Sequence, residues 1–377
     1  MPNDLYAIYN RYTSRTLFFK YCATATLTHR LTRRLSLFTL KKCLTRPQGR
    51  IFSLVNSIYF GGETLEEVQS TVTFLARSGI GCVLDYAVEG ENEEAQFDKA
   101  VENTLRLIEM SQQTDSSLPF VVIKPSSLGS VAVYARQSEE SLLDEASASA
   151  WSRIVARFSH LFDYACSHGV RVMVDAEQTA IQPAVDRLVL DMMREFNRDS
   201  AVITLTLQFY LKDQLRFLDE CYQRACQDNF VLGVKVVRGA YLEEEKRVNG
   251  GERCFATKEE TDRSYNAAVD YIAQRLDRIS PFFATHNEES LALIMKSESL
   301  RAGCTWIGQL YGLGDHITYS LLQTGFRVCK YLPYGPLDKS LPYLLRRIEE
   351  NAIASATFKK ENKLLQKELL RRLVGGR

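Results

Sequence analysis

The sequence lacks most of the features that identify metalloproteins, membrane proteins and nucleic-acid-binding proteins. Its 377 residues contain no apolar run of about 18 residues, so no helix is expected to span a membrane. The nine cysteines include no CxxC pair and the five histidines lie far apart. This pattern predicts reduced thiols and argues against a zinc or other metal site. A net charge of only +1 gives no indication of nucleic-acid binding.

Motifs for phosphate binding and nucleophilic catalysis are also missing. The sequence has no Walker loop and no nucleophile elbow. The GLGD segment at Gly312–Asp315 is only a fragment of a dinucleotide-binding fingerprint and follows the wrong strand to serve as one. A ligand site must therefore be inferred from the residues that the fold brings together.

Acidic residues are almost absent from residues 1–62. Asp4 is the only acid there, whereas ten Lys and Arg occur by residue 50 among many Ser and Thr. A transit peptide has this composition, and so does a basic helix resting on an anionic membrane surface. We therefore expect residues 1–62 to form a basic helical arm, either a targeting or a membrane-associating segment, ahead of a domain at 63–377.

From Glu63 onward, short apolar runs alternate with amphipathic stretches. The predicted strands are 82–86, 120–123, 170–174, 201–207, 231–237, 281–284, 304–307 and 326–332. The predicted helices are roughly 64–77, 92–112, 139–168, 180–197, 211–227, 257–278, 287–299, 314–323 and 338–352, with one more in the tail to Leu373. Eight strands alternating with helices predict a parallel (β/α)8 barrel, and a doubly wound open sheet is the alternative.

The stretch Phe326–Asn351 carries the most specific pattern. Its predicted helix places Arg346, Arg347 and Glu350 on the face opposite a leucine-rich stripe. Two adjacent guanidiniums suit bidentate binding of a carboxylate or phosphate. The alternative is a solvated face with an Arg346–Glu350 pair one turn apart.

In a parallel barrel, ligands bind at the carboxyl ends of the strands. A single polar residue at a strand end is more often a cap or a turn residue. Here all eight predicted strands end in functional groups, which favours a binding site. These residues include Asp85, Tyr86, Glu89, Lys124, Asp175, Glu177, Gln208, Tyr210, Lys235, Arg238, Tyr241, Thr285, His286, Asn287, Gln309, Tyr311 and Tyr331.

The charges at these ends predict an anionic or electron-rich ligand. Lys124 and the two arginines supply three cations, and Asp175 is the expected counter-charge. Lys235 has the strand parity of Val237, so we expect its ammonium in the barrel lumen, where an unpaired charge would be costly.

Two backbone features suit a flat or phosphorylated ligand. Gly239-Ala240 would let such a ligand approach the main chain closely. His286 and Asn287 precede a helix start, whose free N–H groups could receive a phosphate or an adenine edge.

Five blocks resemble the proline dehydrogenase family, above all its single-function form: Val174–Asp186, Lys235–Glu245, Ala284–Asn287, Gly308–Asp315 and Lys330–Asn351. The resemblance implies a distorted (β/α)8 barrel that binds FAD without a Rossmann motif. It implies oxidation of L-proline to Δ1-pyrroline-5-carboxylate by hydride transfer to the flavin, the first step of proline catabolism, with electrons passed to a membrane quinone. The implied location is the matrix side of the mitochondrial inner membrane, or the bacterial cytoplasm at the inner-membrane surface with peripheral membrane association.

The resemblance also implies a role for individual residues. Lys124, Arg346 and Arg347 would bind the proline carboxylate, Asp175 would orient them, and Lys235 would lie near the flavin N5 and O4. Tyr331 and Leu310 would cover the proline ring, and Ala240 and Tyr241 would pack beside substrate and flavin. The remaining implied cofactor contacts are Val174, Gln208, Val237, Arg238, Gly239, Thr285, His286, Asn287 and Glu350.

Three other functions compete with this interpretation. One is 4-hydroxyproline oxidation, against which the bulk of Tyr331 argues. A second is a Schiff-base lyase that uses Lys235 or Lys124. A third is a non-catalytic barrel that binds a carboxylate ligand.

Overall fold

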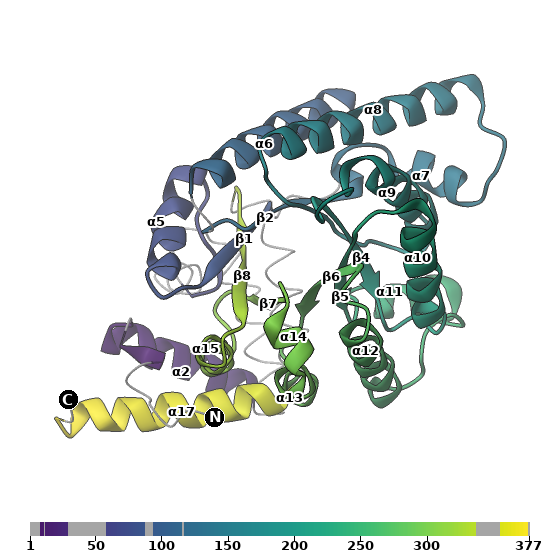
Figure 1. Cartoon of the computed structure of the whole chain (residues 1–377). Helices are drawn as coiled ribbons and strands as arrows, with labels where there is room; N and C mark the ends of the chain where they lie inside the picture. The colour runs from purple at the N-terminus through teal and green to yellow at the C-terminus, as the bar shows by residue number, and fades with distance from the viewer. Residues whose placement is uncertain are drawn as a thin grey trace.

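The computed structural model describes residues 8–10, 12–28, 58–86, 93–114, 117–336 and 355–375. Within them, eight parallel strands form a closed barrel in which each strand pairs with the next and β8 pairs with β1 (Figure 1). The strands are β1 Gly81–Tyr86, β2 Phe120–Ile123, β3 Val172–Val174, β4 Ile203–Gln208, β5 Leu232–Val237, β6 Ile279–Ala284, β7 Trp306–Leu310 and β8 Arg327–Tyr334. The predicted (β/α)8 barrel is confirmed, and the open sheet is excluded because β1 and β8 pair.

Helices surround the barrel (Figure 1). In chain order they are α2 Ser14–Thr28, α5 Leu65–Ala76, α6 Glu94–Gln113, α7 Val131–Ser138, α8 Glu145–Ser167, α9 Gln182–Phe196, α10 Gln214–Asp228, α11 Leu242–Asn249, α12 Lys258–Ala273, α13 Glu288–Lys296, α14 Glu298–Ala302, α15 Asp315–Gln323 and α17 Ser355–Leu373, with a 3-10 turn at Pro125–Ser127. The predicted helix at 338–352 lies outside the described residues.

Local capping explains where the helices differ from prediction. The predicted helix at 139–168 begins only at Glu145, because the Asp144 side chain accepts a hydrogen bond from the Ser147 N–H at 2.7 Å and caps α8. Ser297 ends α13 and caps α14, which divides the predicted helix at 287–299. Helix α11, which carries three glutamates in its first turn, was not predicted.

Two cores flank the sheet. Alternate side chains pack inside the barrel, among them Val83, Phe120, Met173, Phe282, Trp306 and Tyr331. The other strand faces pack against the helices through a larger apolar layer, which includes Val174, Leu205, Val234 and Ile307. This alternation gives each strand end one side chain directed to the lumen and the next directed outward.

The two ends of the described chain meet. Helices α2 and α17 lie side by side along one edge of the barrel (Figure 1). Lys20 of α2 forms ion pairs with Asp315 at the start of α15 and with Glu361 of α17, and all three side chains are 1–2% exposed. Lys330 of β8 approaches Asp315 to 4.0 Å. Two cations and two carboxylates therefore form a balanced buried cluster, which we call the Lys20 cluster.

Candidate active site at the barrel mouth

Lys235 and Asp175 form the central ion pair of the mouth. The Lys235 ammonium lies 2.5 Å from Asp175 Oδ1 and 4.5 Å from the centre of the Tyr331 ring. Lys235 is only 4% exposed, so the predicted lumen position is confirmed. Its charge is stabilised by a carboxylate and by an aromatic face, the two kinds of partner that a buried ammonium needs.

Asp85, rather than Asp175, neutralises Lys124. The Lys124 ammonium lies 2.8 Å from Asp85 Oδ1 and donates to the Tyr86 carbonyl at 2.9 Å. Asp175 was expected to balance Lys124, Arg346 and Arg347; in the structure it pairs with Lys235, while Lys124 pairs with Asp85 of β1, the strand beside β2. A pairing of Asp175 with the two arginines stays a prediction, because both lie outside the described residues. The acid at the end of the first strand was the sequence signal for this pair, and no role was assigned to it.

Glu177 organises the loops after β2 and β3, a role that the sequence did not reveal. Its buried carboxylate accepts hydrogen bonds from the Ser126 N–H at 2.8 Å and hydroxyl at 2.6 Å. Burial raises the pKa of Glu177, and the Ser126 hydrogen bonds oppose that rise. Gln208 donates to the Glu177 carbonyl at 2.8 Å. Gln208 therefore fixes the loop that carries Asp175.

Leu310 and Tyr331 are neighbours across β7 and β8. Their predicted role of covering the proline ring together requires this proximity. The Tyr331 hydroxyl donates to the Met173 sulfur at 3.2 Å, which orients the phenol inside the lumen. Leu310 N–H donates to His286 Nε2 at 2.9 Å, so β6 and β7 are joined at the mouth.

His286 is a neutral imidazole. Burial, and then the nearby Lys330 charge, lower its pKa to about 3. Because Nε2 accepts from Leu310, the proton lies on Nδ1, which has no hydrogen-bond partner among the described residues. A shielded N–H donor is thus left at the mouth, consistent with a contact to a bound group that the structure does not contain.

Arg238 is held on the side of the mouth next to α12 and α13. Its guanidinium pairs with Asp262 at 2.5 Å and donates to Thr285 Oγ1 and Ser290 Oγ, each at 2.8 Å. Although burial raises the pKa of Asp262, hydrogen bonds from Lys258 and Arg238 lower it below its ordinary value. Arg238 and Thr285 therefore form one rigid unit at the rim.

The start of α13 is already capped. Asn287 Oδ1 accepts from the Glu289 N–H at 3.0 Å and the Ser290 N–H at 3.1 Å. The prediction that these N–H groups are free for a phosphate was wrong, because asparagine is itself among the strongest N-cap residues. The Val174 side chain packs in the outer layer between strands and helices, away from the lumen, and the predicted cofactor contact of Val174 stays a prediction.

The β5 exit brings Val237, Gly239, Ala240 and Tyr241 to the mouth in one turn, and Tyr241 is the N-cap residue of α11. Arg346, Arg347 and Glu350 lie outside the described residues, so their predicted roles stay predictions.

Replacing Gly239 by alanine should damage this turn. Gly239 has a φ of +114°, and a Cβ there would lie 1.9 Å from a Tyr210 ring carbon. We expect a loss of about 1–3 kcal/mol in the free energy of unfolding and a reduced kcat/KM, measured by urea unfolding and dye-coupled turnover.

Gly250→Ala is the matched control for Gly239→Ala. Gly250 also has a positive φ, +65°, but a Cβ there meets nothing within 4 Å. It should cost only about 1 kcal/mol from backbone strain and leave turnover intact. Equal effects of the two substitutions would contradict the steric argument.

A family model described as proline dehydrogenase matches residues 68–360. The chain is 93% identical over 376 residues to the carbapenem antibiotics biosynthesis protein CarD of Pectobacterium carotovorum subsp. carotovorum, covering 100% of both chains. It is 38% identical over 239 residues to mitochondrial proline dehydrogenase 1 of Caenorhabditis elegans, covering 59% of this chain and 38% of the relative.

A solved structure of proline utilization A from Bdellovibrio bacteriovorus, inactivated by N-propargylglycine, superposes with a TM-score of 0.72. The identity is 19%, over 96% of this chain and 40% of that chain, which supports the fold alone. The family model spans most of the barrel, including every strand from β1 to β8. The chain therefore belongs to the proline dehydrogenase family.

Proposed function

We propose that this protein oxidises L-proline to Δ1-pyrroline-5-carboxylate with FAD as its cofactor. The observation that carries the proposal is the lumen pair of Lys235 and Asp175 beneath the aromatic ring of Tyr331. That site is closed laterally by the strands, and Lys235 would present a fixed cation to a flat, electron-accepting ring bound there. A Schiff-base lysine would instead need a neutral amine, whereas Lys235 is held as a cation by a carboxylate.

The residues at the mouth fit a flavin. The donors are two cations, Lys235 and Arg238, with the hydroxyl of Thr285 and the orphaned N–H of His286. This set suits an anionic dinucleotide whose ring gains negative charge when it is reduced. Bound FAD would supply the hydride acceptor. The protein's own contribution is to orient the substrate, exclude water and place the Lys235 charge where negative charge develops.

Substrate binding follows from the remaining groups. Lys124, positioned by Asp85 and the Tyr86 carbonyl, would bind the proline carboxylate together with Arg346 and Arg347. Tyr331 and Leu310 would cover the ring and set specificity. The amine proton would pass to solvent before hydride leaves C5.

A visible spectrum tests the proposal directly. Purified protein should be yellow, and adding L-proline without oxygen should bleach its absorbance. Turnover with a dye acceptor should be at least tenfold lower for 4-hydroxyproline, because Tyr331 crowds a C4 hydroxyl and rejecting such a group is worth roughly 1–3 kcal/mol. A colourless folded protein that ignores added FAD would contradict the cofactor, and a preference for hydroxyproline would contradict the substrate.

The use of the product is a separate question. The full-length identity to a carbapenem biosynthesis protein favours supply of Δ1-pyrroline-5-carboxylate for biosynthesis over catabolism. Disrupting this protein in a carbapenem-producing host should abolish the antibiotic, and added Δ1-pyrroline-5-carboxylate should restore it. If the disrupted strain still made the antibiotic but could no longer grow on proline, the result would favour catabolism.

We assign the electrons to a membrane quinone and the protein to the cytoplasmic face of a bacterial inner membrane. The support is the basic composition of residues 1–62 and a bacterial relative that matches over the whole chain. None of the described helices has the length and apolar composition to cross a membrane. Sedimentation with anionic vesicles, and turnover with a soluble quinone, would test the two assignments.

A further inference from the structure

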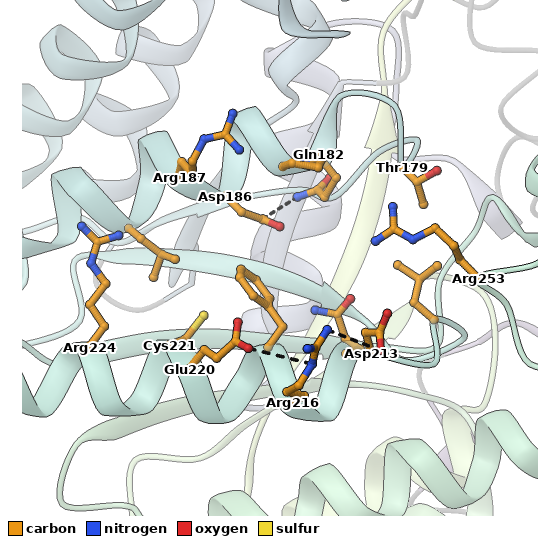
Figure 2. Close-up of a pocket in the computed structure, with 15 residues that line it drawn as sticks. Thr179, Gln182, Asp186, Arg187, Asp213, Arg216, Glu220, Cys221, Arg224 and Arg253 are labelled. Carbon is orange, nitrogen blue, oxygen red and sulfur yellow. Dashed lines mark hydrogen bonds and ion pairs between the residues drawn. The ribbon is translucent and has the colours of Figure 1, made fainter. Parts of the chain in front are cut away.

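A cavity lies outside the barrel, between α9 and α10 (Figure 2). Its volume is about 370 Å³, and Arg253, from the turn before α12, closes one end. The lining is both charged and apolar: Asp186, Arg253, Gln182, Gln214, Leu211 and Phe217. A cavity of this size and character suits a small molecule with charged groups and an apolar part.

Asp186 is a buried carboxyl without a cationic partner. It is 8% exposed, and Gln182 Nε2 donates a hydrogen bond to its Oδ1 at 2.7 Å. Arg187, the next residue, approaches Glu140 instead, at 3.5 Å. Figure 2 shows the Asp186 carboxyl directed into the cavity. Within the described part of the chain, no Lys or Arg forms an ion pair with it.

Arg253 presents the opposite charge across the cavity. Its guanidinium points toward Gln182 and Asp186 (Figure 2), and no acid among the described residues pairs with it. The other arginines of the rim have partners. Arg216 approaches Asp213 and Glu220, and Arg224 pairs with Asp191 at 2.5 Å. Among the residues that line the cavity, Asp186 and Arg253 are therefore the carboxyl and the guanidinium that form no ion pair within the described part of the chain, and they lie on facing walls (Figure 2).

We propose that this cavity binds a small amino acid in its zwitterionic form and that its occupancy changes the kinetics of proline oxidation. The ligand ammonium would pair with Asp186 and its carboxylate with Arg253. An aliphatic side chain would pack on Leu211 and Phe217. Both charges would then gain partners, one at the buried Asp186 and one at the exposed Arg253, through charge-assisted hydrogen bonds.

Gln182 connects this cavity to the barrel mouth. Its amide nitrogen donates to Asp186, and its amide oxygen accepts from the Glu177 N–H at 2.8 Å. Glu177 lies two residues after Asp175, the partner of Lys235. A ligand that binds Asp186 would therefore contact the residue to which Gln182 donates. Through Gln182 it would be linked to the loop that carries Asp175.

Binding should depend on pH. Burial raises the pKa of Asp186 to about 7, with Gln182 and Arg187 opposing that rise. Other groups facing it across the cavity are Arg253, and Glu220, Cys221 and Arg224 on α10; burial raises the pKa of the Cys221 thiol, which is neutral. An ammonium ligand needs ionised Asp186, so affinity should fall as pH drops below about 7, with proton release on binding.

Titration calorimetry on the holoenzyme tests the site, with L-leucine, N-acetyl-L-leucine and L-leucinamide as probes. L-leucine should bind saturably, and each analogue, which lacks one charge, should bind at least tenfold more weakly. Asp186→Asn and Arg253→Gln should each abolish the L-leucine signal, whereas Arg216→Gln, on the same rim, should not. Absence of saturable binding, equal binding of N-acetyl-L-leucine, or binding unchanged in both variants would overturn the site.

Proline kinetics test the coupling, which rests on the proposed function. Saturating L-leucine should change the KM for proline at least twofold in the parent enzyme, and not in Arg253→Gln. Calorimetric binding without such a change would overturn the coupling. Because calorimetry needs no turnover, failure of the proposed reaction and failure of this site give different results.

Discussion

Replacing Lys235 by methionine should lower kcat for proline by about 100-fold or more, the usual cost of removing one preorganised electrostatic group from an active site. Lys235 is only 4% exposed, and it is held by Asp175 at 2.5 Å. Methionine preserves the volume of the side chain and removes the charge. Anaerobic reduction by proline, followed by stopped flow, would measure the loss at the chemical step.

Two variants make this result interpretable. Lys235→Arg keeps the charge but changes its geometry, so it should retain more activity than methionine. Asp175→Asn should lower activity and also destabilise the protein, because it leaves the buried Lys235 charge without its counter-ion. If Lys235→Met reduced the flavin at the parent rate, the electrostatic role proposed for Lys235 would be wrong.

Replacing Lys20 by methionine should produce the largest loss of stability, about 3–5 kcal/mol in the free energy of unfolding. Lys20 is 1% exposed and pairs with both Asp315 and Glu361. Without it, the buried carboxylates of Asp315 and Glu361 lose the cation with which both pair. Urea denaturation followed by circular dichroism would measure the change.

A charge-balanced variant tests the cause. Adding Glu361→Gln to Lys20→Met leaves Lys330 opposite Asp315, so the double variant should be more stable than the single one by about 1 kcal/mol or more. Lys246→Met, which removes an exposed cation near Glu243, should cost less than about 1 kcal/mol. A double variant less stable than Lys20→Met would show that packing, rather than charge balance, dominates the Lys20 cluster.

The barrel could be predicted from sequence because each strand is a short apolar run between helices with a clear polar face. Its eight strands agree with the prediction to within three residues at each end. Local hydrogen bonds were harder to predict. Asp144, Ser297 and Asn287 each cap a helix through one side-chain oxygen, which sequence periodicity does not reveal.

The sequence was enough to name many residues of the site. It was less informative about which of them form ion pairs or hydrogen bonds with each other. Strand parity was enough to place Lys235 in the lumen. To pair Asp85 with Lys124, one must know the register of β1 against β2. To find the hydrogen bonds of Glu177, one must know how the loops after β2 and β3 lie relative to each other. The Lys20 cluster joins residues 295 and 341 positions apart, a separation that no local pattern encodes.

The seam between β1 and β8 has a consequence for synthesis. Gly81–Tyr86 pairs along its whole length with Cys329–Tyr334, so the first strand lacks one neighbour until the last has left the ribosome. Helix α2 is separated from its partner α17 by an even longer stretch of sequence, so it packs later still. During translation one edge of β1 is therefore unpaired until β8 has been synthesised, and a nascent chain of this protein should depend on chaperones until Arg327–Tyr334 emerges.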